Sequence, residues 1–152
     1  LLSVPGASTR PTSDRLRESL FTILSGNVRG AVVLDLFAGT GALGVEALSR
    51  HAHRAVFIDN QAKAVSVITK NINACSFEEI ARIYKWDITR NLNCLNGRER
   101  LFDLVFMDPP YNQNQIETIF LACRQNPIVT PDGIIILEHK MKNKIDTAKL
   151  PF

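Results

Sequence analysis

Short apolar runs that alternate with helix-patterned segments constrain the fold of this chain more than any other feature. The apolar runs are Ala31–Phe37, Ala55–Ile58, Ala81–Lys85, Leu101–Met107 and Gly133–Glu138. Most of them are nearly continuous in apolar residues, which is typical of strands buried on both faces of a sheet. Crossovers between parallel strands are right-handed, so this alternation predicts a mostly parallel sheet with helices on both sides.

Helices are expected before and between the strands. The segments are residues 12–25, the stretch from the glycine turn to Arg50, Gln61–Ala74 and Gln115–Gln125. In the first of them Thr12 or Ser13 can cap the helix, and Gly26 is predicted to end it. The expected architecture is therefore α/β, a Rossmann-like, doubly wound sheet in a single domain with an N-terminal helix.

Composition bounds the domain organisation and the class of protein. A chain of 152 residues, with 45% hydrophobic and 22% charged residues, has the size and balance of one soluble domain. Residues 1–10 are expected to form an N-terminal arm and residues 11–152 the domain. Truncation is expected at the start, because the first residue is Leu1 and not methionine, and at the end, because the final strand pair is incomplete after Lys140. No apolar run is long enough to cross a bilayer and no signal pattern opens the chain, so a cytoplasmic protein without a membrane partner is expected.

Charge and cysteines add two exclusions. Cys75, Cys94 and Cys123 lie far apart without C-x-x-C spacing, so neither a disulfide framework nor a metal site is expected. The net charge of +3 is compatible with an anionic partner but does not require one.

Four aspartates mark the ends of predicted strands. Asp35 lies near the end of the first strand, and Asp59, Asp87 and Asp108 each close or follow a later one. In a parallel α/β sheet, ligands bind beyond the carboxyl ends of the strands. The four carboxylates are therefore predicted to converge on one rim that holds a ligand.

The turn after the first strand contains the pattern G-x-G-x-x-G from Gly39 to Gly44. Such glycines let a cofactor approach the backbone at a helix N-terminus, and Asp59 lies where an acid that binds ribose hydroxyls belongs. A dinucleotide fits this pattern, but Asp35 would repel its pyrophosphate and attract the ammonium and sulfonium of S-adenosylmethionine. The turn therefore favours S-adenosylmethionine over a dinucleotide.

The sequence Asp108-Pro109-Pro110-Tyr111 directly follows an apolar strand. Two prolines fix the backbone and remove two N–H donors, which leaves a rigid edge rich in acceptors. An exocyclic amino group of a base could donate to the Asp108 carboxylate and the Pro109 carbonyl, so that its lone pair points at a methyl donor. Tyr111 could stack on the extruded base. This motif is of no use in hydride transfer but suits methyl transfer.

With both motifs placed, the chain resembles class I methyltransferases, and closely the RsmD family of bacterial 16S ribosomal RNA guanine-N2 methyltransferases. The residues that carry the resemblance are Arg10-Pro11-Thr12-Ser13-Asp14-Arg15-Leu16-Arg17-Glu18-Ser19-Leu20-Phe21, Leu34-Asp35-Leu36-Phe37-Ala38-Gly39-Thr40-Gly41 and Asp108-Pro109-Pro110-Tyr111. The likeness spans residues 10–138, and the helix that begins with Arg-Pro-Thr distinguishes this family from other enzymes with Asp-Pro-Pro-Tyr.

The resemblance implies a role for each matched position. The residues expected around the methionine part of the cofactor are Asp35, Phe37, Ala38, Gly39, Thr40 and Gly41, and those expected around its ribose and adenine are Asp59, Asn60, Trp86, Asp87 and Ile88. The residues expected at the target amine are Asp108, Pro109, Pro110 and Tyr111. On the substrate side the resemblance implies Arg10, Thr12 and Arg15. The implied cofactor is S-adenosyl-L-methionine. The implied partner is ribosomal RNA within the small subunit, bound by a monomer that needs no metal.

Three other functions fit parts of the same pattern. A DNA adenine-N6 methyltransferase uses similar catalytic geometry, although it usually carries a target-recognition domain for which this chain has no room. A protein glutamine methyltransferase poses the same chemical problem at an amide nitrogen. A Rossmann-type dinucleotide-binding protein without transferase activity would use the glycine turn alone.

Overall fold

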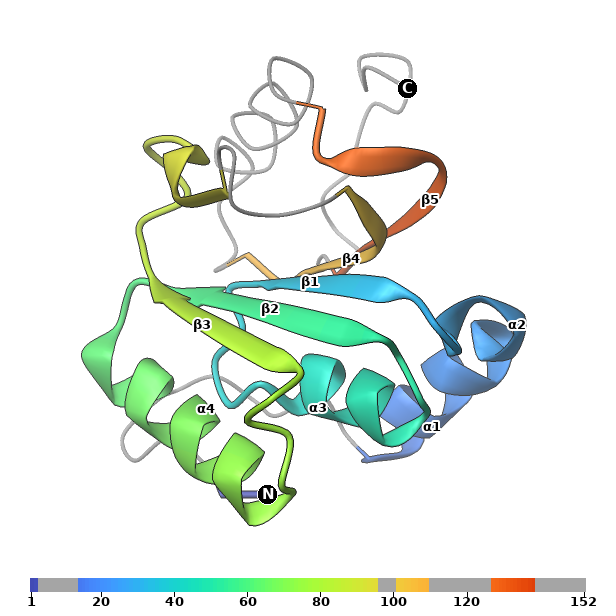
Figure 1. Ribbon diagram of the computed structural model, residues 1–152, viewed down its shortest axis with the longest axis horizontal. Coiled ribbons are helices and arrows are strands. Elements are labelled where there is room, and N and C mark those ends of the chain that lie inside the picture. Colours follow the sequence, from blue (N-terminus) through green and yellow to red (C-terminus); the bar gives the residue numbers. More distant parts are fainter. Residues whose placement is uncertain (3–13, 96–100, 110–126, 139–152) are drawn as a thin grey trace.

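A parallel five-stranded sheet forms the centre of the protein (Figure 1). The structure is a computed structural model and describes residues 1–2, 14–95, 101–109 and 127–138. Its elements are α1 (Asp14–Ile23), α2 (Ser25–Val28), β1 (Val32–Leu36), α3 (Ala42–Ser49), β2 (Arg54–Asp59), α4 (Ala62–Ala74), β3 (Ala81–Lys85), the 3₁₀ helix η1 (Asn93–Leu95), β4 (Phe102–Met107) and β5 (Val129–Leu137).

The strand order creates one point at which the direction of winding reverses. The order across the sheet is β3-β2-β1-β4-β5, so the chain moves outward from β1 to β3 and then returns to the other side of β1. Leu36 at the end of β1 pairs with Ile58 of β2 and with Met107 of β4, which levels the carboxyl ends of these strands. Loops after β1 and β4 therefore diverge at a switch point, the place where α/β folds bind ligands.

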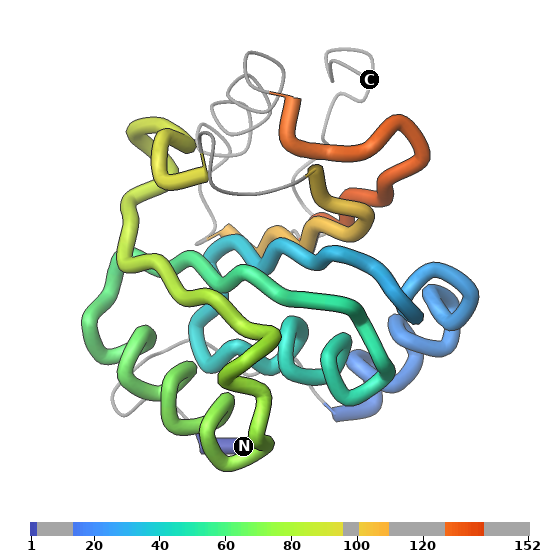
Figure 2. Tube along the Cα trace, in the orientation of Figure 1, coloured from blue at the N-terminus to red at the C-terminus, as the bar shows by residue number. Residues whose placement is uncertain are grey.

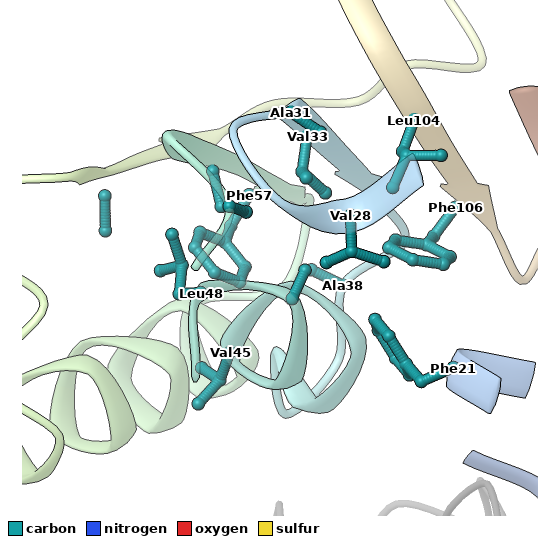
Figure 3. Packing of buried hydrophobic residues seen from close by; sticks show 14 of the residues in the cluster. Phe21, Val28, Ala31, Val33, Ala38, Val45, Leu48, Phe57, Leu104 and Phe106 are labelled. Carbon is teal, nitrogen blue, oxygen red and sulfur yellow. The ribbon is translucent and has the colours of Figure 1, made fainter. Parts of the chain in front are cut away.

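One face of the sheet is covered by helices. Phe57 and Phe106 point from the sheet into this layer, where Phe21 of α1 and Leu48 of α3 meet them (Figure 3). The rings of Phe21 and Phe106 are tilted with centroids 5.7 Å apart, an edge-biased arrangement that aromatic pairs favour. The guanidinium of Arg50 covers the outer side of the Phe21 ring at 5.1 Å. These contacts fix α1 and α3 against the sheet.

The opposite face is covered by the chain that follows β3. In Figure 2 this yellow segment turns away from α4 and crosses to the other side of the sheet. There Ile88, Leu92 and Leu95 pack on residues such as Leu36 and Ile58. The segment thus belongs to the hydrophobic core, although it contains little regular structure.

Strands β1 to β4 and helices α3 and α4 confirm the predicted elements within a residue or two at each end. Two details were wrong. The first helix is divided at Leu24, and Gly26 lies inside α2 instead of ending the helix; Gly30, with φ +78°, makes the turn into β1. Strand β5 starts at Val129 and not at Gly133, because a bulge opposite Phe102 and Leu104 accommodates the intervening turn residues.

Some predictions fall on other parts of the chain. The predicted helix over 115–125 and most of the arm over 1–10 lie outside the described residues. Within the described ranges, every helix is too short or too polar to span a lipid bilayer.

Gly44 and Gly26 provide a matched pair for testing the packing of α3 on the sheet. A Cβ on Gly44 would press on the Phe57 ring, 2.7 Å from Cζ, whereas a Cβ on Gly26 would meet nothing within 4 Å. We expect Gly44→Ala to lower the free energy of unfolding by about 1–3 kcal/mol through overpacking. Gly26→Ala should be neutral or stabilise by about 0.5 kcal/mol. Urea unfolding measures both, and equal midpoints for the two variants would contradict this packing.

Candidate active site

The loop after β1 turns sharply at the carboxyl edge of the sheet. Phe37 has φ +58°, a left-handed conformation that is rare for a bulky residue, and Gly39 and Gly41 have φ +56° and +75°. The Ala38 N–H donates to the Ile58 carbonyl of β2 at 3.0 Å, and the Gly41 N–H donates to the Ala38 carbonyl at 2.6 Å. Backbone strain held by such bonds is typical of binding loops.

Asp59 fastens this loop to the end of β2. Its carboxylate accepts the Gly39 N–H at 2.9 Å through Oδ2 and the Gln61 N–H at 2.8 Å through Oδ1. The side chain is buried, with 8% exposed. Since each carboxylate oxygen has two lone pairs, both oxygens can still accept a hydrogen bond from a ligand hydroxyl.

A pocket lies beside the loop at the ends of β2 and β3. Its lining consists of Phe37, Ile58, Asp59, Asn60, Trp86, Asp87 and Ile88. Six of these seven residues were predicted from the sequence to bind the cofactor; Ile58 was not. The pocket combines apolar walls with two carboxylates, the composition typical of small-molecule sites.

The wall formed after β3 is held in place by backbone contacts. The Trp86 N–H donates to the Asp59 carbonyl at 3.0 Å, and its indole N–H donates to the Asn91 carbonyl at 3.1 Å. The indole remains 38% exposed. Asp87 accepts the Thr89 hydroxyl at 2.6 Å, and this hydrogen bond lowers the pKa of the Asp87 carboxyl, with Arg90 adding to the effect.

Asp35 lies beneath the glycine loop. Its Oδ2 accepts the Gly44 N–H at 2.9 Å, which ties β1 to the first turn of α3, and only 3% of the residue is exposed. Burial raises the pKa of the Asp35 carboxyl to about 8; repulsion from Asp108 and Asp59 adds to the rise, and the Gly44 hydrogen bond opposes it. The sequence suggested a charged side chain here, but burial favours the neutral acid at pH 7 until a cation approaches.

Asp108 and Pro109 lie at the end of β4, beside the end of β1. Asp108 is half-buried and Pro109 is buried. Burial and the nearby Glu138 raise the pKa of the Asp108 carboxyl to about 6. The charge of Asp108 also raises the pKa of the Asp35 carboxyl, so the two groups lie close enough to interact electrostatically. The structure thus brings Asp35, Asp59 and Asp108 to one edge, as expected.

Asn71 is a site residue that sequence reasoning missed. This side chain of α4 is 1% exposed, and its amide donates to the Thr40 carbonyl at 2.9 Å and to the Leu2 carbonyl at 3.2 Å. Its Oδ1 accepts the Leu2 N–H at 2.7 Å. Asn71 thus joins the glycine loop to the start of the chain. A polar residue on the apolar side of a predicted helix, next to Ile68 and Ile72, was the available signal.

The remaining predicted residues are placed less completely. Arg15 is exposed on α1. Arg10, Thr12, Pro110 and Tyr111 lie outside the described residues. Within the ranges that the structure describes, no three His, Cys, Asp or Glu side chains are grouped closely enough to hold a metal ion.

The raised pKa of Asp35 predicts how stability depends on pH. Between pH 3.8 and about 8 the unfolded chain loses this proton and the folded protein retains it, so stability falls by about 1.4 kcal/mol per pH unit from this group. We expect Asp35→Asn, which keeps an acceptor for Gly44, to be more stable than the parent by on the order of 2–4 kcal/mol at pH 7. The difference should vanish near pH 4. Urea unfolding at several pH values tests this; parallel pH profiles would contradict it.

Known proteins are similar to this chain in sequence and in fold over nearly the whole of its length. A family model described as "Conserved hypothetical protein 95" matches residues 1–150. YlbH of Bacillus subtilis is 36% identical over 139 residues, covering 91% of this chain and 76% of that protein. The ribosomal RNA small subunit methyltransferase D of Escherichia coli is 32% identical over 148 residues, covering 97% and 73%.

Solved structures are also similar to the fold of this chain. That of the Escherichia coli protein yhhF matches with a TM-score of 0.82 at 32% identity, over 96% of this chain and 78% of that one. The sheet and its helices have the class I methyltransferase fold. The chain therefore belongs to the family described as Conserved hypothetical protein 95, the RsmD family of ribosomal RNA methyltransferases.

Proposed function

We propose that the protein transfers a methyl group from S-adenosyl-L-methionine to the N2 amino group of a guanine in small-subunit ribosomal RNA. The observation that carries the proposal is the position of Asp108, on the same edge of the sheet as the glycine loop and its neighbouring pocket. Family membership supports ribosomal RNA as the substrate. Guanine-N2 as the target rests on the resemblance and on the chemistry of the Asp108 motif.

The residues of the pocket fit an adenosine that ends in a cationic amino acid. Asp59 presents carboxylate lone pairs at the pocket for ribose hydroxyls, and the Trp86 and Ile88 side chains offer an apolar surface for adenine. Asp35, Phe37 and the loop from Ala38 to Gly41 would hold the methionine part. When bound, S-adenosylmethionine supplies an electrophilic methyl group.

Asp35 is suited to a cationic ligand in particular. Its carboxyl stays neutral while the site is unliganded at pH 7, because burial and neighbouring acids disfavour the charge. An ammonium group nearby would favour the carboxylate. Binding at neutral pH should therefore release a proton, which an anionic dinucleotide would not cause.

Asp108 and its following prolines orient the target amine. The Asp108 carboxylate and the Pro109 carbonyl accept its two N–H groups, so that the nitrogen lone pair is directed away from the ring. Tyr111 stacks on the base. Positioning of this kind supplies much of the catalysis, up to about 7–11 kcal/mol in favourable cases. The proton of the methylated amine leaves to Asp108 or to water, so no step calls for a metal.

The proposal includes the setting in which the enzyme works. Its partner is ribosomal RNA, within the small subunit, and it acts as a monomer with one methyltransferase domain over residues 11–152. Arg10, Thr12 and Arg15 contribute on the substrate side. Since ribosomal RNA is modified where ribosomes assemble, the enzyme works in the cytoplasm.

Cofactor binding is the first prediction. Trp86 is the one tryptophan of the chain and lines the pocket, so its fluorescence reports on ligands there. We expect S-adenosylhomocysteine to change this fluorescence in a saturable way, and calorimetry to give one site per chain with proton release at pH 7. NAD should do neither. Tight binding of NAD without binding of S-adenosylhomocysteine would overturn the cofactor assignment.

Methyl transfer tests the substrate. We expect label from S-adenosylmethionine to enter guanine of 30S particles from a strain that lacks the modification. Exclusive labelling of duplex DNA or of protein would reject ribosomal RNA and favour one of the two alternative methyltransferases.

The role of Asp108 predicts a separation of binding from turnover. Asp108→Ala should keep the affinity for S-adenosylhomocysteine within about threefold and lower kcat by roughly 10²–10³. In the parent enzyme kcat/KM for the RNA, measured at saturating S-adenosylmethionine, should fall as the pH drops through about 6, because Asp108 then gains a proton. Equal losses of affinity and turnover in the variant would mean that Asp108 is structural.

A further inference from the structure

Glu138 follows β5 and lies next to Asp108. The Glu138 N–H donates to the Met107 carbonyl at 2.9 Å, a hydrogen bond that belongs to the parallel pairing of Met107 with Leu137. Asp108 directly follows Met107, the last residue of β4, as Glu138 follows Leu137, the last residue of β5. Asp108 and Glu138 thus come directly after two paired residues at the neighbouring ends of adjacent strands.

The two side chains belong to the same face of the sheet. Phe106 and Ile136 pack in the layer with the helices, whereas Met107 and Leu137 pack on the opposite face. Side chains alternate along a strand, so the following residues, Asp108 and Glu138, return to the face of Phe106. Repulsion from Glu138, which raises the pKa of the Asp108 carboxyl, agrees with this placement.

Like charges on neighbouring strands repel each other, and a ligand that donates a hydrogen bond to each carboxylate lowers this repulsion. Glu138 is exposed and accessible to a large substrate. Two adjacent carboxylates offer acceptors only. A guanine presents two adjacent donors, N1–H and the N2 amino group. Adenine and cytosine instead pair their amino group with an unprotonated ring nitrogen, which a carboxylate repels.

We propose that Glu138 selects guanine by accepting its N1–H while the N2 amino group faces Asp108. The inference rests on the proposed function, and it names the group that decides which base is accepted. Adenine and cytosine would direct a ring lone pair at the Glu138 carboxylate. Their amines would therefore lie at Asp108 only at the cost of an unfavourable contact.

A base analogue isolates this contact. 2-Aminopurine keeps the N2 amino group, but its N1 is an acceptor. Once the guanine methylated by the parent enzyme is mapped, small-subunit particles are reconstituted with guanine or with 2-aminopurine at that nucleotide. The measured quantity is the ratio of kcat/KM for the two particles, with the parent enzyme and with Glu138→Gln, whose amide can donate to N1 of the analogue.

We expect the parent enzyme to prefer guanine strongly, and Glu138→Gln to narrow the ratio by roughly ten- to hundredfold. The ratio narrows because kcat/KM falls for the guanine particle and rises for the 2-aminopurine particle. Glu138→Ala should narrow the kcat/KM ratio less. This variant loses the acceptor for N1–H of guanine and removes the repulsion between the carboxylate and N1 of 2-aminopurine, but it offers no new donor. The matched control is Asp132→Asn, an exposed carboxylate of the same strand, β5, which should leave the ratio unchanged.

Affinity for S-adenosylhomocysteine, followed by Trp86 fluorescence, should be the same in all variants. A ratio that stays unchanged in Glu138→Gln, while the parent methylates guanine, overturns the role of Glu138 and leaves the proposed function intact. A parent enzyme that labels no guanine removes the proposed function and this inference with it.

Discussion

The hydrogen bond from the Gly44 N–H to the buried Asp35 carboxyl is the interaction on which the site depends. It joins the central strand to the first turn of α3 and thereby fixes both ends of the glycine loop. Gly44 has no side chain because the Phe57 ring occupies that space. The carboxyl that we propose to bind the cofactor thus also joins two packed elements, and its neutral form is the one that the folded protein favours at pH 7. The desolvation penalty of a charged Asp35 therefore arises only when a cation binds, because the carboxyl is protonated in the unliganded site.

The carboxyl ends of β2, β1 and β4 lie level with one another, and this alignment positions the acidic residues of the site. Because β1 pairs in parallel with both β2 and β4, acids from three neighbouring strands reach one edge of the sheet. The surroundings of these three acids differ in burial and in hydrogen bonding. Asp59 is tied to two backbone donors, Asp35 is buried, and Asp108 is half-buried beside Glu138. Burial and hydrogen bonding thus give chemically identical side chains different protonation behaviour.

Sequence patterns predicted the sheet and most of the rim, because continuous apolar strands and glycine turns are local signals. Predictions from these patterns were wrong where contacts between distant parts of the chain determine the local structure. Gly26 lies within α2 because Gly30 makes the turn, and β5 starts early because a bulge absorbs the turn residues. The charge state of Asp35 could not be predicted, since it depends on burial beneath a loop. Asn71 was missed because its partners, Thr40 and Leu2, are far away in sequence.

The bonds made by Asn71 also bear on how such a protein can change. Leu2 is anchored on α4, and α1 is anchored in the core through Phe21, so the chain is held at two separate points ahead of β1. Lengthening a loop costs only about 0.6 kcal/mol per doubling. A connection between two such anchors can therefore change in length over generations while the sheet and the glycine loop keep their geometry.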